Sequence, residues 1–168
     1  RFGKDTGLTG RSFLWQRADE LIAARPIAGL GYGAFWLDDN LAAQAIWDRF
    51  GITTRIGFNF HSTPKEILVH LGYLGLAVFA IVVAFAVIGL LWRQVRDADE
   101  GSLLMLGFAT FLGAAAPFEL VGFGTMNFAS VLAFTCIAYG YLRTVGAKAT
   151  YNRSTASPLH PNRDRRRL

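Results

Sequence analysis

The residue best suited to acid–base chemistry is His61, which stands just before a long apolar segment. An imidazole can accept a proton from a hydroxyl nucleophile at neutral pH, so His61 is a candidate general base. The alternative is a histidine at a membrane interface that only bonds a neighbouring carbonyl group. Position alone leaves both interpretations open.

Four further polar side chains suit an anionic substrate or chemistry at a membrane surface. Arg11, Arg25 and Arg55 carry guanidinium groups, whose forked donors match phosphate oxygens. Glu119 lies near the end of an apolar stretch, and a carboxylate at membrane depth is a functional candidate. The alternatives are ordinary surface positions for the arginines and a water-exposed turn for Glu119.

Two patterns imitate known sites without meeting their requirements. Glu66 and His70 are four residues apart, but no third ligand is in register, so we expect no metal. Residues 29–34, Gly-Leu-Gly-Tyr-Gly-Ala, imitate a nucleotide-binding loop. The last glycine of that motif is replaced and no βαβ pattern surrounds it, so we expect a tight loop packed against aromatic residues.

The elements that must position these residues are predicted to be helices in a membrane. The 168 residues are 52% hydrophobic and 17% charged, with a mean hydropathy of +0.31, which is too apolar for an ordinary soluble domain. Residues 63–142 are predicted to hold three transmembrane helices, at about 64–92, 103–120 and 122–142, in an all-α polytopic protein. Because the chain begins with arginine and not methionine, we expect a C-terminal fragment that further spans precede.

Residues 1–62 are predicted to form a loop region with amphipathic helices at the membrane surface. Apolar side chains of residues 12–24 fall on one helical stripe. A second helix, over residues 40–50, has Asn40 as its N-cap and Gly51 after its last turn. The aromatic side chains of this region suit the lipid headgroup layer: Trp15, Tyr32, Trp36 and Trp47.

The join between the loop region and the first span fits a capping box. Thr63 is the predicted N-cap, Pro64 opens the first turn, and Glu66 reaches back to the cap. The free N–H groups of this helix end would then face the same region as His61. A phosphate or pyrophosphate is favoured at such an end.

Positive charge predicts the orientation of the spans. The link at 93–102 holds two arginines, residues 143–168 hold seven basic side chains and one acidic, and the turn at 121–125 holds no basic residue. The link and the tail are therefore predicted to be cytoplasmic, which puts residues 1–62 in the periplasm. We expect the tail, residues 143–168, to be disordered and attracted to membrane lipids. Nucleic-acid binding is not expected, because no aromatic residues interleave the basic ones.

Three motifs, in their order and spacing, resemble one family over roughly residues 6–92. They are Leu-Thr-Gly-Arg at 8–11 followed by a tryptophan, Arg-Pro-Ile-Ala-Gly-Leu-Gly-Tyr-Gly-Ala-Phe-Trp at 25–36, and His61 followed by Gly72 and by Gly-Leu at 75–76. The sequence resembles the O-antigen ligase and polymerase superfamily, nearest to exopolysaccharide production proteins of the ExoQ type. Ser62 departs from the asparagine that many relatives carry after the histidine.

The resemblance implies a glycosyltransferase of the bacterial inner membrane with a periplasmic loop over its active site. It implies an undecaprenyl-pyrophosphate-linked glycan as donor and a glycan or lipid as acceptor, with no nucleotide sugar, cofactor or metal. By the same resemblance His61 deprotonates the acceptor hydroxyl, Arg11 engages the pyrophosphate, and Arg25 is a weaker candidate for that anion. We expect the fragment alone to be inactive. The alternative function is a non-catalytic membrane component for polysaccharide binding or export.

Overall fold

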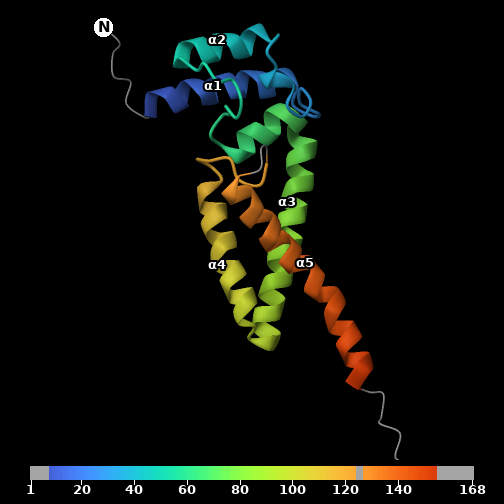
Figure 1. Cartoon of the computed structure of the whole chain (residues 1–168). Coiled ribbons are helices and arrows are strands. Elements are labelled where there is room, and N and C mark those ends of the chain that lie inside the picture. Colours follow the sequence, from blue (N-terminus) through green and yellow to red (C-terminus); the bar gives the residue numbers. More distant parts are fainter. Residues whose placement is uncertain (1–7, 124–126, 155–168) are drawn as a thin grey trace, which may run out of the picture.

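The computed structural model describes residues 8–123 and 127–154, and every regular element in these ranges is helical. The elements, in chain order, are α1 (Leu8–Ala24), η1 (Ala34–Trp36), α2 (Leu41–Phe50), α3 (Thr63–Asp97), α4 (Glu100–Ala115) and α5 (Phe128–Ser154). Figure 1 shows two parts: a head, residues 8–62, in which α1 and α2 lie across one end of α3, and a bundle of α3, α4 and α5. The predicted all-α fold is confirmed for the described residues.

Helix α1 buries one face in the core of the head because its apolar residues recur at helical spacing. Leu14, Ala18 and Ile22 are 2%, 0% and 8% exposed, and they face one apolar core. The core also includes side chains from η1, α2, the segment before α3 and α3 itself: Phe35, Ala43, Ile46, Trp47, Phe60 and Val69. The predicted stripe of residues 12–24 is therefore confirmed, but its apolar face packs inside the head.

Helix α2 has the two ends that its sequence predicts. The Asn40 side chain accepts a hydrogen bond from the backbone N–H of Ala42, and Gly51 takes the left-handed conformation after the last turn. Trp47, on the buried face of α2, is 1% exposed. The prediction that Trp47 lies in the headgroup layer is wrong, because its indole fills the core between α1 and η1.

A break at Gly72 divides α3, and a loop of the head forms the hydrogen bonds that the helix loses there. Gly72 has φ 64° and ψ −166°, so the helical hydrogen bonds around it cannot form. The N–H groups of residues 73 and 74 donate instead to the carbonyls of residues 26 and 27, at 2.8 and 3.1 Å. The carbonyls of residues 69 and 70 accept from the N–H groups of residues 30 and 31, at 2.9 and 2.8 Å.

Glycine is required on both sides of this contact. A Cβ added to Gly72 would lie 2.3 Å from the carbonyl oxygen of Ile27, and one added to Gly29 would lie 2.5 Å from the carbonyl carbon of His70. The predicted tight loop at residues 29–34 is confirmed. It packs against the backbone of α3 as well as against aromatic rings.

The bundle is held at its far end by a close helix crossing. Gly89 of α3 and Gly140 of α5 approach so closely that a Cβ on Gly89 would lie 2.8 Å from the Gly140 carbonyl oxygen. The buried Arg93 donates to the carbonyl oxygens of Tyr139 and Gly140, at 2.7 and 2.8 Å. These contacts fix α5 across α3 at the end opposite the head.

Among the described residues, α3 is the one helix long and apolar enough to cross a membrane, with 35 residues. Helix α4 has 16 residues, and the apolar part of α5, Phe128–Tyr141, is also shorter than a full span. The second and third crossings therefore stay predictions. The predicted boundaries differ from the helices at several ends, since α3 continues to Asp97, α4 ends at Ala115 and α5 begins at Phe128.

The prediction of a tail that is disordered from residue 143 onwards is wrong for its first part. Helix α5 continues to Ser154, through residues with good helix propensity such as Ala147, Lys148 and Ala149. The remainder of the predicted tail, residues 155–168, lies outside the described residues.

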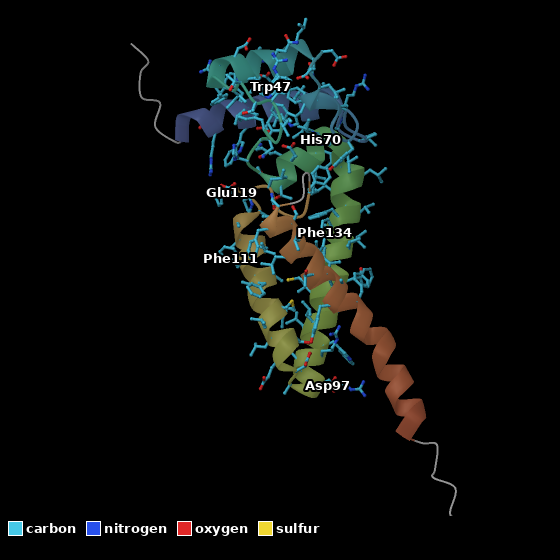
Figure 2. All side chains as sticks on the ribbon, viewed as in Figure 1. Trp47, His70, Asp97, Phe111, Glu119 and Phe134 are labelled. Atoms are coloured by element: carbon cyan, nitrogen blue, oxygen red, sulfur yellow. The ribbon has the colours of Figure 1, made fainter. Side chains whose placement is uncertain are left out.

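The bundle presents large apolar side chains to its surroundings. Only 11% of the most apolar window of α3 is buried. Phe111 of α4 and Phe134 of α5 are 67% and 50% exposed and are visible on the bundle in Figure 2. Such surfaces are typical of helices that face lipid or further helices.

Candidate functional site

Three residues from distant parts of the chain meet where the head rests on the bundle. Arg11 Nη2 donates to Glu119 Oε1 at 2.9 Å, and His61 Nδ1 lies 3.8 Å from Glu119 Oε2. The side chains of Arg11 and His61 are each 37% exposed, and that of Glu119 is 55% exposed. The cluster is thus held by protein contacts and is open to a ligand from outside.

His61 sits on a short segment whose backbone is fixed from several sides. Its φ of 50° is a left-handed conformation that is uncommon for residues other than glycine. The side chain of Asn59 accepts from the His61 N–H at 2.8 Å. The neighbouring Phe60 donates its N–H to Glu66 Oε2 at 2.8 Å and accepts from Trp15 Nε1 at 3.0 Å. A strained residue held in this way is a common feature of active sites.

Thr63 fixes the backbone of Glu119 beside His61. The Thr63 hydroxyl donates to the carbonyl oxygen of Glu119 at 2.7 Å and accepts from the N–H of Val121 at 2.7 Å. The N–H of Thr63 donates to the carbonyl oxygens of Ala116 and Glu119, at 2.9 and 3.1 Å. The turn after α4 is therefore tied to the residue that opens α3.

These contacts overturn two predictions about the start of α3. Ser62 and not Thr63 is the N-cap residue, its side chain makes no capping bond, and Glu66 does not reach back to it, so the capping box is wrong. The first N–H of α3 is already paired, and Ser62 and Thr63 are 4% and 2% exposed. A phosphate at this helix end is therefore not supported, and Arg11 is the cation that faces the cluster.

Glu66 and His70 form a buried polar pair under the head, near the label of His70 in Figure 2. Glu66 Oε1 accepts from Trp36 Nε1 at 2.8 Å and lies 3.5 Å from His70 Nε2. His70 Nδ1 accepts from the N–H of Gly33 at 3.2 Å. The pair attaches η1 and the glycine loop to α3, and no group of three metal-ligating side chains occurs among the described residues.

The structural role of Glu66 was not predicted from the sequence, although one signal was present. An acidic residue in an apolar helix that does not cap its own helix must find donors elsewhere. Trp36 and the backbone of Phe60 are those donors. Phe60 precedes His61 in the chain, and the ring of Trp36 packs against that of Phe60.

Arg25 and Arg55 lie apart from the cluster. Arg25 follows the opposite end of α1 from Arg11, about 21 Å along the helix axis. It is exposed, and no ion pair of its guanidinium group occurs among the described residues. Arg55 pairs with Asp38 at 3.3 Å and lies over the ring of Trp47 at 5.2 Å. Neither arginine contacts Arg11, His61 or Glu119.

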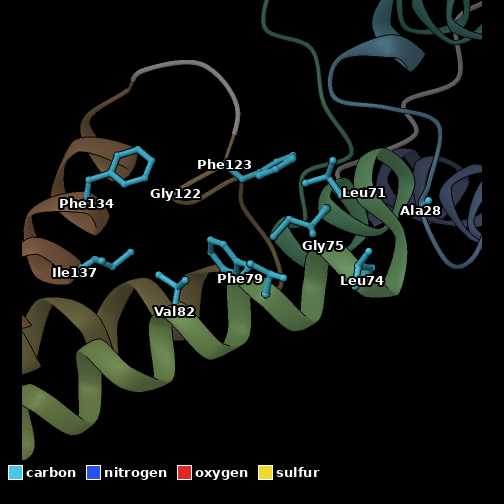
Figure 3. Close-up of a pocket in the computed structure, with 12 residues that line it drawn as sticks. Ala28, Leu71, Leu74, Gly75, Phe79, Val82, Gly122, Phe123, Phe134 and Ile137 are labelled. Carbon is cyan, nitrogen blue, oxygen red and sulfur yellow. The ribbon is translucent and has the colours of Figure 1, made fainter. Parts of the chain in front are cut away.

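An apolar groove of about 550 Å³ runs along α3 on both sides of the Gly72 break, from Ile67 to Val82, and also touches Ala28 of the head. Figure 3 shows that side chains of α3 and α5 line it together with residues 122 and 123, which follow Glu119 by three and four positions. Its lining is almost entirely hydrocarbon and glycine. The groove therefore suits lipid chains or further helices and provides no group for acid–base chemistry.

The cluster combines the elements of an acyl- or glycosyl-type transfer to a hydroxyl group. His61 leaves Nε2 free of any hydrogen bond among the described residues, so this atom can accept a proton. Arg11 provides a cation for an anionic leaving group, and Glu119 provides a carboxylate to both.

Comparison with known proteins shows which family the sequence is similar to. The profile of the O-antigen ligase family matches residues 1–80. The exopolysaccharide production protein ExoQ of Rhizobium meliloti (strain 1021) is 38% identical over 120 residues, which are 71% of this chain and 28% of that relative. The chain therefore spans less than a third of the relative's length. No solved structure matches the chain.

Proposed function

Because this chain belongs to the O-antigen ligase superfamily of membrane polysaccharide polymerases and ligases, with an ExoQ-like sequence, we propose that the protein is a glycosyltransferase of polysaccharide assembly. The proposed donor is a glycan on undecaprenyl pyrophosphate, and the proposed acceptor is a sugar hydroxyl. The proposed location is the bacterial inner membrane, with the head in the periplasm and the end of α5 in the cytoplasm.

The observation that carries the proposal is the convergence of Arg11, His61 and Glu119. The members of this cluster come from α1, from the segment before α3 and from the turn after α4, and Arg11 and Glu119 are 108 positions apart. Surface ion pairs contribute little to stability, so such an arrangement is not needed to hold the fold. Its position is also appropriate, since it lies at the head end of the apolar bundle.

The proposed reaction is a single displacement. The acceptor hydroxyl gives its proton to His61 Nε2, and its oxygen forms a bond to the anomeric carbon of the donor sugar. The bond between that carbon and the pyrophosphate oxygen breaks, and the electron pair leaves with the pyrophosphate. Arg11 stabilises this leaving group more strongly in the transition state than in the ground state, because negative charge grows there.

Arg25 and Arg55 have a more distant role in this proposal. Both are exposed on the head, away from the reacting atoms. They are proposed to contact outer parts of the donor or the acceptor glycan, where forked donors suit acidic or hydroxyl groups.

The test replaces His61 by alanine in the full protein and measures polymer in cells that lack the wild-type copy. We expect normal insertion and a loss of at least a hundredfold in transfer, the usual contribution of a general base. Arg11→Ala should also abolish polymer. Arg17→Ala is the matched control, since Arg17 lies on the same helix and pairs with Glu20 in an exposed ion pair. Normal polymer with His61→Ala would reject the general base and favour a non-catalytic role in export.

A further inference from the structure

The carboxylate of Glu119 is shared between the two groups that the proposed reaction requires. Its Oε1 accepts from Arg11 Nη2 at 2.9 Å, which is a full hydrogen bond. Its Oε2 lies 3.8 Å from His61 Nδ1, which is about 1 Å too far for one. In this structure the carboxylate is therefore bonded to the arginine and only close to the histidine.

The side chain of Glu119 can change partner, whereas its backbone is fixed. Its carbonyl oxygen is held by the hydroxyl and the N–H of Thr63, at 2.7 and 3.1 Å. The side chain is 55% exposed and needs a rotation, without a backbone shift, to move from one partner towards the other. His61 is fixed in turn by Asn59 and by the bonds of Phe60, so it does not have to move.

An arriving pyrophosphate competes directly with Glu119 for Arg11. Both are anions, and both require the forked donors of the same guanidinium group. Repulsion between them pushes the carboxylate away from the phosphate oxygens, and the Nδ1–H of neutral His61, 3.8 Å from its other oxygen, is a donor that it can reach. The ion pair with Arg11 therefore opposes donor binding, while its loss brings Glu119 to the base.

We propose that Glu119 is a positioning residue that changes partner during the reaction, from Arg11 in the empty site to His61 Nδ1 when donor pyrophosphate is bound. This inference rests on the proposed function. In the second state the carboxylate accepts the Nδ1–H of His61, so Nε2 carries the lone pair that accepts the acceptor's proton. The resulting imidazolium is stabilised by the adjacent carboxylate, which stays ionised throughout. Donor binding thereby prepares the base, and an empty site is less able to activate water.

The test is Glu119→Gln in the full protein, reconstituted in lipid nanodiscs. Glutamine keeps the shape and removes the charge, so we expect inorganic pyrophosphate to bind about two- to fivefold more tightly, as the loss of a competing exposed ion pair implies. We expect kcat for transfer from the lipid-linked donor to fall about tenfold or more, because the imidazolium loses its partner. Glu119→Asp keeps the charge and should recover part of kcat.

Glu20→Gln is the matched control, because Glu20 is 50% exposed and pairs with Arg17 at 2.6 Å. It should change neither quantity. If Glu119 only supported the fold, Glu119→Gln would lower kcat without tightening pyrophosphate binding, and this result would overturn the inference. An unchanged kcat would overturn it as well. Arg11→Ala separates the two proposals: if it leaves pyrophosphate binding intact, the proposed function fails and this inference with it. If Arg11→Ala weakens pyrophosphate binding, but Glu119→Gln does not both tighten that binding and lower kcat, the inference alone fails.

Discussion

Replacing Thr63 by valine should release the turn that carries Glu119. Valine nearly keeps the shape of threonine, so the change removes a hydroxyl that bonds the Glu119 carbonyl and the Val121 N–H, both at 2.7 Å. The Val121 N–H is then left unpaired in a site where Thr63 is 2% exposed, at a cost of about 1–3 kcal/mol. The Glu119 carbonyl keeps the bond from the Thr63 N–H, so its loss is smaller, about 0.5–1.5 kcal/mol.

Together these losses amount to about 1.5–4.5 kcal/mol of local stability. Hydrogen exchange of the Val121 amide should therefore become about 10- to 2000-fold faster, measured by mass spectrometry on peptides that cover residues 116–123. Transfer activity should fall as well, because the carboxylate is no longer held beside His61. Thr63→Ser is the control, since it keeps the hydroxyl and should exchange like the wild type. If Thr63→Val leaves both the exchange and the activity unchanged, the hydroxyl does not hold this turn and the geometric argument for the site is wrong.

Two further substitutions test the parts that support the cluster. Gly72→Ala should destabilise the protein by about 2 kcal/mol or more, because φ is 64° there and the new Cβ would meet the Ile27 carbonyl at 2.3 Å. We expect a lower melting temperature and faster proteolysis at residues 26–31. The control is Gly107→Ala, where a Cβ meets nothing within 4 Å. Glu66→Gln should cost about 1.5–3 kcal/mol, because one of the two N–H donors that now reach the carboxylate would face an NH₂ group; an unchanged melting temperature would contradict the role assigned to Glu66.

Much of the local structure could be predicted because its causes are local. The ends of α2 follow from Asn40 and Gly51, whose side-chain bond and left-handed φ depend on neighbouring residues only. The α1 stripe follows from helical spacing in the same way. The capping box was predicted wrongly because its residue types also suit another use. Thr63 forms its hydrogen bond with the turn after α4, and Glu66 forms its bond with the head. These distant partners replace the local capping bonds.

The candidate residues could be selected from the sequence, but their arrangement could not. His61, Arg11 and Glu119 each had a plausible surface interpretation, and nothing in the spacing pairs a residue of α1 with one 108 positions later. Their meeting depends on how α4 returns to the head and on the Thr63 bonds that fix the turn. Arg25 and Arg55 had the same chemical merit as Arg11, yet the length of α1 and the contact with Trp47 put them elsewhere.

The break at Gly72 divides α3 into a short part under the head and a long apolar part. Before the break, residues 63–71 lie under the head, and their polar members Glu66 and His70 are 3% and 4% exposed. After it, residues 73–97 are largely apolar and exposed, and about 25 residues at 1.5 Å each reach roughly 37 Å, enough for a hydrocarbon core. The polar part of α3 therefore holds the head, through Glu66 and His70, and the apolar part is the candidate span. In the proposed function, a lipid whose chains lie beside the second part has its phosphate groups at the level of the first, where Arg11 and His61 lie.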